Sequence, residues 1–390
     1  MLRKGIYVLL GLILSFRLAT AQSAESLSAA KEQAETRRQP LLIAFISDDC
    51  DDCRAFVRAS GESPDVQGAL GAVAFYQVDA KSDEGRELVK KYDIGIRLPT
   101  FIFADATGSE ITRWKNFLAP QPWLKKFSRA QSDVTTVEDR LARMDQTPTF
   151  ADAMTLGSYC SEADRFADAA RYYRVADRLN PDNKRDLKYD IFHALALSAW
   201  SGETDFTTVE RAADDVLNSS YRTTINSARV ASELTSLAIR LKKTDRLKKY
   251  LNFTIQGLSA GESPQYVRMR SRYEADYELY VNHDTAAAIK NAEVSAGPAF
   301  RRQPVDHYNF AIWCIERGIH LDEAARLLKK LYDAGEVPRG TEAGKQYDYS
   351  RLALARGDVD EAINLAREAC RIDPVNPVYQ EHLRDCEKQD

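Results

Sequence analysis

The hydrophobic pattern changes once along the chain. Up to about residue 131, short apolar runs alternate with segments of helical periodicity, which is typical of buried strands between helices. We predict strands at 41–46, 73–78, 100–104 and 110–114, and helices at 24–37, 82–92 and 120–130. From about residue 132, the strand signals fade and alanine-rich helical spacing takes over. The pattern therefore predicts an α/β domain at 22–131 and an all-α domain at 132–390.

The order of elements in the first domain suggests its architecture. A strand, a helix and a second strand come first, and a hairpin around the turn 106–108 follows, with a closing helix. Ser63 and Pro64 match a helix cap followed by proline at the first helical position. This order favours a mixed sheet that is covered by helices.

The first residues resemble an export signal. A basic start, Met1–Lys4, precedes an apolar run at 5–16, and Ala19 and Ala21 form a small-x-small cleavage site. We predict a signal peptide at 1–21, cleaved after Ala21, and a periplasmic or secreted mature protein. Arg17 is unusual in a cleavage region, so an uncleaved anchor remains an alternative. We expect no membrane span in the mature form.

Charge and residue content narrow the possible partners. The 54 basic and 58 acidic residues nearly balance, and no basic block suggests a nucleic-acid partner. Six cysteines are too few for a disulfide scaffold in 390 residues. The five histidines show no metal-binding spacing, and none falls within 22–131. We expect neither a metal nor another cofactor.

The candidate chemistry lies in Cys50-Asp51-Asp52-Cys53, directly after the first predicted strand. If a helix begins here, Cys50 lies among unpaired N–H groups at the positive end of the helix dipole, which favours its thiolate. Cys53 lies one turn later and can close a disulfide. A redox pair, a static disulfide and half of a metal site all remain compatible with this spacing.

A second marker is Leu98-Pro99-Thr100, at the start of the third main strand. With the cysteine pair and the order of elements, it makes residues 22–131 resemble the thioredoxin fold. The resemblance implies that Pro99 is cis and packs beside the cysteines, since cis peptides are essentially confined to proline. It also implies that Cys50 attacks, that Cys53 resolves, and that Leu98 and Thr100 bind the substrate.

Two positions depart from the thioredoxin pattern. Asp49 stands where an aromatic residue usually precedes the first cysteine, and Ala44 stands where the family has a buried acid. The family's usual proton acceptor for the second sulfur is therefore missing.

Acidic residues surround the first cysteine. Each carboxylate destabilises a Cys50 thiolate by about 0.5–3 kcal/mol. The helix terminus stabilises the thiolate by about 0.3–2 kcal/mol, and Arg54 stabilises it by about a few tenths of a kcal/mol. We expect a higher pKa for Cys50 than for a typical nucleophile of the family, which favours a reductase-like or slow couple over a strong oxidant. The four acids are Asp48, Asp49, Asp51 and Asp52.

The helical remainder resembles tetratricopeptide repeats. One window matches that 34-residue pattern at Leu156-Gly157, Cys160, Ala169, Tyr173, Ala176 and Pro181. Another matches at Gly357-Asp358, Ala362, Ala366, Ala369 and Pro374. We predict a right-handed solenoid of about six or seven helix pairs. The resemblance implies peptide or protein binding, and Cys370 with Cys386 is the additional disulfide to test.

These observations predict an exported thiol–disulfide oxidoreductase-like protein with a helical docking domain. Its partners would be protein thiols, disulfides or peptides, with a further protein as electron donor or acceptor. The alternative is a non-catalytic scaffold in which the first domain is a degenerate module and the helical repeats carry the function.

Overall fold

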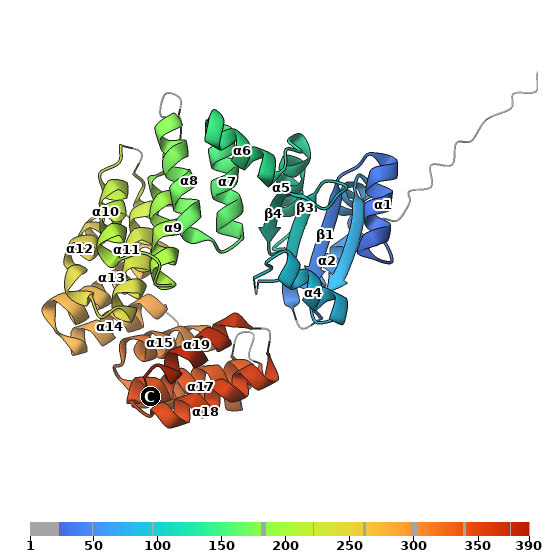
Figure 1. Cartoon of the computed structure of the whole chain (residues 1–390). Coiled ribbons are helices and arrows are strands. Elements are labelled where there is room, and N and C mark those ends of the chain that lie inside the picture. The colour runs from blue at the N-terminus through green and yellow to red at the C-terminus, as the bar shows by residue number, and fades with distance from the viewer. Residues whose placement is uncertain are drawn as a thin grey trace, which may run out of the picture. The chain divides into compact units, whose positions relative to one another are not determined.

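The computed structural model describes residues 23–389 except 49, 96, 181–184, 221, 260–262, 298–302, 338–340 and 375. It forms two compact units, one extending to Arg143 and the other beginning at Met144 (Figure 1). The predicted domain boundary at residue 131 stays a prediction. The predicted signal peptide, together with Asp49 and Pro181, lies outside the described residues.

A four-stranded mixed sheet forms the centre of the first unit. Its strands are β1 (Leu41–Ile46), β2 (Ala74–Asp79), β3 (Thr100–Ala104) and β4 (Glu110–Lys115). They lie in the order β2-β1-β3-β4, with β1 parallel to β2 and antiparallel to β3 (Figure 1). The predicted α/β class and mixed sheet are confirmed.

Helices cover both faces of this sheet. Residues of α1 (Leu27–Arg37) and α4 (Asp83–Lys91) pack on one face. Residues of α2 (Asp51–Glu62), α3 (Pro64–Gly71) and α5 (Pro120–Ser132) pack on the other. Every residue of β1 is buried, as expected for a strand that is covered on both sides.

An aromatic cluster fixes α2 against the sheet. The Phe56 ring is completely buried, and its centroid lies 4.8 Å from that of Phe101 and 5.8 Å from that of Trp123. Edge-on and tilted contacts of this kind add to the free energy of burial. Because Phe56 lies one turn after Cys53 on α2, this cluster also positions the cysteine pair.

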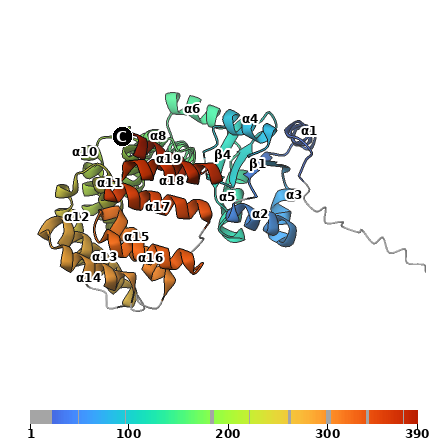
Figure 2. The same cartoon turned by 90° about the horizontal axis from the view of Figure 1, so that it is seen from below.

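The second unit contains only helices among its described residues. Six consecutive pairs pack as neighbours from α7 to α18, which confirms the predicted helical repeats (Figure 2). A first helix, α6, spans the boundary between the units at Val137–Gln146. The paired helices are α7 (Phe150–Glu162), α8 (Phe166–Leu179), α9 (Lys188–Trp200), α10 (Phe206–Leu217), α11 (Thr224–Arg240), α12 (Lys248–Leu258), α13 (Pro264–Tyr277), α14 (Thr285–Ala296), α15 (Pro304–Arg317), α16 (Leu321–Asp333), α17 (Glu342–Arg356) and α18 (Val359–Ile372), and α19 (Pro377–Glu387) follows.

Small residues permit the close pairing that the sequence pattern predicted. A Cβ atom at Gly157 on α7 would come within 2.6 Å of the Tyr173 ring on α8. The helices can therefore approach this closely only with glycine at that position. Ala169 and Ala176 on α8 are completely buried, as are Ala362 and Ala369 in the last pair.

Side-chain contacts join the last helix to much earlier ones within the second unit. Arg240 of α11 forms ion pairs with Asp385 at 2.7 Å and with Glu381 at 3.3 Å, both on α19. Its guanidinium also lies 4.7 Å from the ring of Trp200, whose indole N–H donates to Glu381. We refer to these four side chains as the α19 contact.

The suggested disulfide between Cys370 and Cys386 is not formed. Both are free thiols, and Cys386 is buried with its sulfur 3.5 Å from His382 Nε2. The thiol of Cys386 packs within the last helices, whereas Cys370 on α18 is only half-buried. Burial also raises the pKa of the Cys386 thiol, so the group is not activated for exchange.

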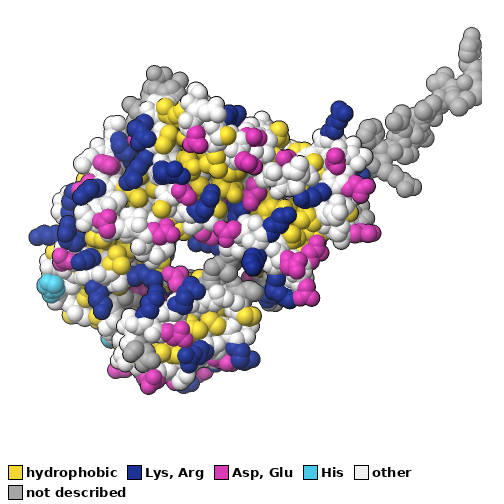
Figure 3. All heavy atoms as spheres, in the orientation of Figure 1, with side chains coloured by type: hydrophobic (Ala, Val, Ile, Leu, Met, Phe, Trp, Pro, Cys, Tyr) yellow, Lys and Arg dark blue, Asp and Glu magenta, His cyan; other side chains and the backbone are white. Residues whose placement is uncertain are grey.

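The face shown in Figure 3 has no large region of one charge, and the described residues contain no membrane-spanning helix. On the face shown in Figure 3, basic and acidic side chains are interspersed over both units. Among the described residues, no helix combines the length and the hydrophobicity needed to cross a bilayer.

Candidate redox site

Cys50 begins α2, and its backbone and side chain both take part in the helix cap. It has the extended conformation of a helix-capping residue, and the N–H of Cys53 lies 3.0 Å from its sulfur. The helix dipole is therefore directed at the sulfur, as the sequence predicted. Cys50 is partly exposed, which leaves this sulfur accessible to a partner.

Cys53 forms a disulfide with Cys50, with the two Cα atoms 5.1 Å apart. The side chain of Cys53 is buried, with only 1% of its surface exposed. It belongs to an apolar cluster that includes Ala44, Phe56 and Phe101. The exposed and buried sulfurs are therefore distinct in access and environment.

The turn before β3 lies against this pair. The Leu98–Pro99 peptide bond is cis, as predicted, and the Leu98 carbonyl oxygen lies 3.3 Å from Cys50 Sγ. Pro99 is buried and Leu98 is half-buried. A reduced Cys50 thiol would donate a hydrogen bond to this carbonyl. The structure thus brings together Cys50, Cys53 and Leu98, with Pro99 next to Leu98 in the turn.

The side chain of Thr100 is buried, so it is not placed to contact a substrate directly. It is 1% exposed, and its hydroxyl donates to the carbonyl of Arg97 at 2.6 Å. The side chain therefore supports the proline turn from within. Substrate binding by Thr100 stays a prediction, and only its backbone could make the contact.

Two supporting residues were not identified from the sequence. Asn116, in the left-handed conformation just after β4, donates its N–H to the Pro99 carbonyl at 2.8 Å. Ser47, just after β1, accepts from the N–H of Cys50 through its carbonyl, at 3.2 Å. An asparagine directly after a strand is a weak signal for such a turn, because asparagine tolerates positive φ. Nothing local indicates the role of Ser47.

The acidic residues around Cys50 are mostly exposed to solvent. Arg54 forms an ion pair with Asp51 and donates to the carbonyl of Asp48, so its charge is directed toward the acidic loop. The side chains of Arg54 and Asp51 are 52% and 67% exposed, which weakens their electrostatic effects. Asp51 and Asp52 occupy the first turn of α2, where negative charge also stabilises the helix.

The site has the parts required for thiol–disulfide exchange. It combines an accessible sulfur at a helix terminus, a buried partner sulfur and a peptide carbonyl next to the accessible sulfur. Among the described residues, no group of His, Cys, Asp and Glu has the arrangement of a metal site.

Comparison with known proteins places this site in a defined domain class. The family model for thioredoxin-like domains matches residues 27–131. Residues 27–131 are therefore a thioredoxin-like domain, with a Cys-x-x-Cys pair at the start of α2.

Several curated relatives are thiol:disulfide interchange proteins named DsbD. The relative from Cronobacter sakazakii is 31% identical over 80 residues, which cover 20% of this chain and 14% of the relative. The relative from Pectobacterium atrosepticum is 33% identical over 97 residues, covering 23% and 17%. This chain therefore matches only about a sixth of the length of these relatives.

A solved structure resembles the chain more weakly. The tetratricopeptide repeat protein from Parabacteroides merdae has a TM-score of 0.31 and 14% identity, covering 61% of this chain and 98% of its own. A score this low does not establish a common fold. The description of the second unit as an array of helix pairs depends on its own helix packing.

Proposed function

We propose that this protein is an exported thiol–disulfide oxidoreductase in which Cys50 exchanges electrons with protein cysteines. The observation that carries the proposal is the accessible Cys50 sulfur at the start of α2, 3.3 Å from the Leu98 carbonyl. The thioredoxin-like domain and the interchange function of the partial relatives support the same chemistry.

In the reductive direction, the exchange has two steps. The Cys50 thiolate attacks one sulfur of the partner's disulfide, and the partner's other sulfur leaves as a thiolate. The Cys53 thiolate then attacks the Cys50 sulfur, closes the Cys50–Cys53 disulfide and releases the partner's second sulfur as a thiolate. Two electrons pass to the partner, and a dithiol protein returns them to the cysteine pair.

The remaining site residues position the partner. The backbone of Leu98 faces Cys50, so an extended peptide bonded to this segment would place its cysteine at the attacking sulfur. We assign Pro99 to holding this segment, and the acids Asp48, Asp51 and Asp52 with Arg54 to setting the charge around the thiolate. The helical unit would bind the partner protein.

An insulin-reduction assay with dithiothreitol as electron donor tests the activity. Cys50→Ser should abolish the turnover above background, and Cys53→Ser should accumulate a mixed disulfide that excess reductant cleaves. Cys370→Ser, which changes a half-buried cysteine outside the site, should keep full activity. Wild-type turnover at background level, or full turnover in Cys50→Ser, would reject the oxidoreductase.

One observation favours the alternative of a non-catalytic scaffold. Cys53 packs in the same apolar cluster as Ala44, which stands where the thioredoxin pattern has a buried acid, so that usual proton acceptor is missing. In that case the cysteine pair is a static disulfide, and the helical unit carries the binding function. Loss of the disulfide would then change stability without changing any turnover.

A further inference from the structure

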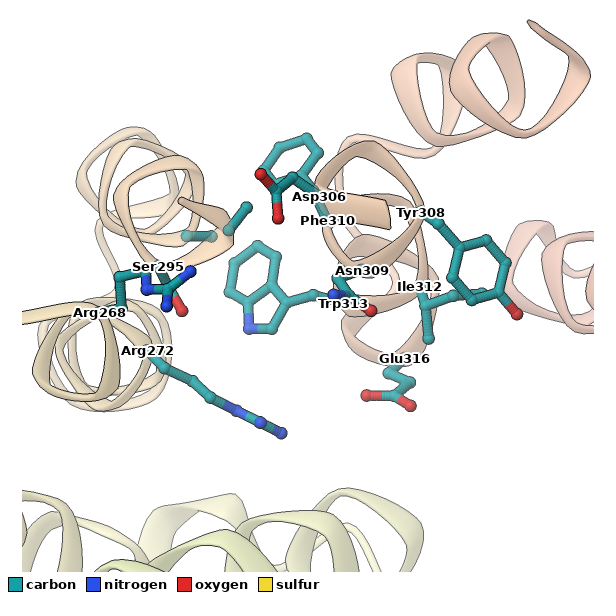
Figure 4. A pocket seen from close by; sticks show the side chains of 12 residues that line it. Arg268, Arg272, Ser295, Asp306, Tyr308, Asn309, Phe310, Ile312, Trp313 and Glu316 are labelled. Carbon is teal, nitrogen blue, oxygen red and sulfur yellow. The ribbon is translucent and has the colours of Figure 1, made fainter. Parts of the chain in front are cut away.

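The second unit contains a cleft between α13, α14 and α15. Its volume is about 370 Å³, within the range of roughly 300–1,000 Å³ that is usual for ligand pockets. Small residues of α14, Ala292, Ser295 and Ala296, line it and leave room between the other two helices. The indole of Trp313 forms the floor of the cleft (Figure 4), where it is only 8% exposed and donates its N–H to Asp276 at 3.2 Å.

The α13 side of the cleft is positively charged. Arg268 and Arg272, one turn apart on α13, extend into the open space (Figure 4). Both residues are exposed, and in the described part of the chain neither forms an ion pair. Arg270, between them, pairs with Glu274 of its own helix at 3.3 Å. Two guanidinium groups are therefore available for carboxylates of a ligand.

The α15 side carries negative charge. Asp306, in the first turn of α15, lines the cleft with only 8% of its surface exposed, and no described side chain pairs with it. Glu316, near the other end, already binds Arg351 at 3.0 Å and Arg317 at 3.2 Å. A buried carboxylate without a partner is costly, so a cation that entered here would be stabilised.

A buried ion pair between Asp276 of α13 and Arg317 of α15, 2.6 Å apart, joins the two helices, but it uses none of the arginines that line the cleft. No ion pair connects α13 to the acids of α15 among the described residues, although their charges are opposite. In an extended peptide, successive side chains point in opposite directions. A segment with an acidic residue next to a basic one would therefore present the acid to Arg268 and Arg272 and the base to Asp306.

We propose that this cleft binds an extended peptide in which acidic and basic residues alternate. This assigns a ligand class to the docking role of the helical unit. It rests on the proposed function only in taking the peptide to be part of the redox partner protein. The cleft itself requires no redox chemistry.

Binding of two fluorescein-labelled peptides to the full chain tests the proposal. One peptide alternates Asp and Lys, and the other has the same composition with all Asp before all Lys. The alternating peptide should bind about tenfold more tightly, and Arg268→Ala with Arg272→Ala should weaken it by about tenfold or more. Asp306→Asn should weaken it as well. Arg270→Ala, a matched loss of charge on the same helix, should change affinity less than about twofold.

A reversal of charge gives an independent check. Arg268→Glu with Arg272→Glu makes both sides negative, so this variant should prefer an all-Lys peptide. Equal affinity for the two mixed peptides, no binding of either, or an equal loss in Arg270→Ala would overturn the proposal. Insulin reduction in the same samples separates the outcomes, because a chain that reduces insulin but binds neither peptide rejects only the cleft.

Discussion

Neutralising the first turn of α2 should activate Cys50. In Asp51→Asn with Asp52→Asn, two negative charges near the sulfur are removed, and Arg54 loses its partner Asp51. At about 6 Å and with an effective dielectric near that of water, each carboxylate destabilises the thiolate by about 0.7 kcal/mol. Asp51 is 67% exposed, which justifies the high dielectric. The pair thus accounts for about 1.4 kcal/mol, or a tenfold change in thiolate fraction at fixed pH.

The assay is the rate of iodoacetamide alkylation of the reduced protein, with the adduct located by peptide mass. Below the pKa of the Cys50 thiol, the variant should react about tenfold faster at low salt, and the difference should shrink in 1 M salt because ions screen exposed charges. The matched control is Asp83→Asn with Glu84→Gln at the start of α4. There Asp83 pairs with Arg86 at the same three-residue spacing. Unchanged or slower alkylation, or equal acceleration in the control, would refute the reasoning.

Three further predictions concern stability of the full chain. Phe56→Ala empties the centre of the aromatic cluster and should lower the unfolding free energy of the first unit by about 3–5 kcal/mol in urea; a loss below about 1 kcal/mol would contradict it. Arg317→Met leaves Asp276 buried without its 2.6 Å partner and should cost the second unit about 3–5 kcal/mol, whereas Lys329→Met at an exposed pair should cost under about 1 kcal/mol. Burial lowers the pKa of His382 from 6.5 to about 4. Since unfolding then takes up a proton, calorimetry should show stability lost as pH falls from 6.5 toward 4, and His382→Gln should reduce this loss.

Much of the first unit could be predicted because its signals are local. The strands at 41–46 and 100–104 have the predicted limits, since continuous apolar runs between polar residues leave little choice of boundary. The second strand lies one residue later than predicted, at Ala74–Asp79. The cysteine pair was found from its position after the first predicted strand, whereas Pro99 was found through the resemblance to the thioredoxin fold.

The supporting contacts could not be predicted, because they join residues that are distant in sequence. The bond from Asn116 to the Pro99 carbonyl depends on how β4 ends beside β3. In the second unit, α13 continues into a π-helix at Glu278–Asn282, which helical periodicity does not distinguish from an α-helix. The unpaired charges of the cleft between α13 and α15 likewise depend on packing.

The α19 contact changes how the helical unit should respond to local unfolding or truncation of its last helix. In a linear repeat array, each pair touches only its neighbours, so the ends can open independently of the middle. Here a terminal helix is fastened to Arg240 of the third pair, and opening it exposes an arginine that two carboxylates had neutralised. Truncation before Glu381 should therefore increase the rate of amide hydrogen exchange in α11, although α11 is far from the cut in sequence.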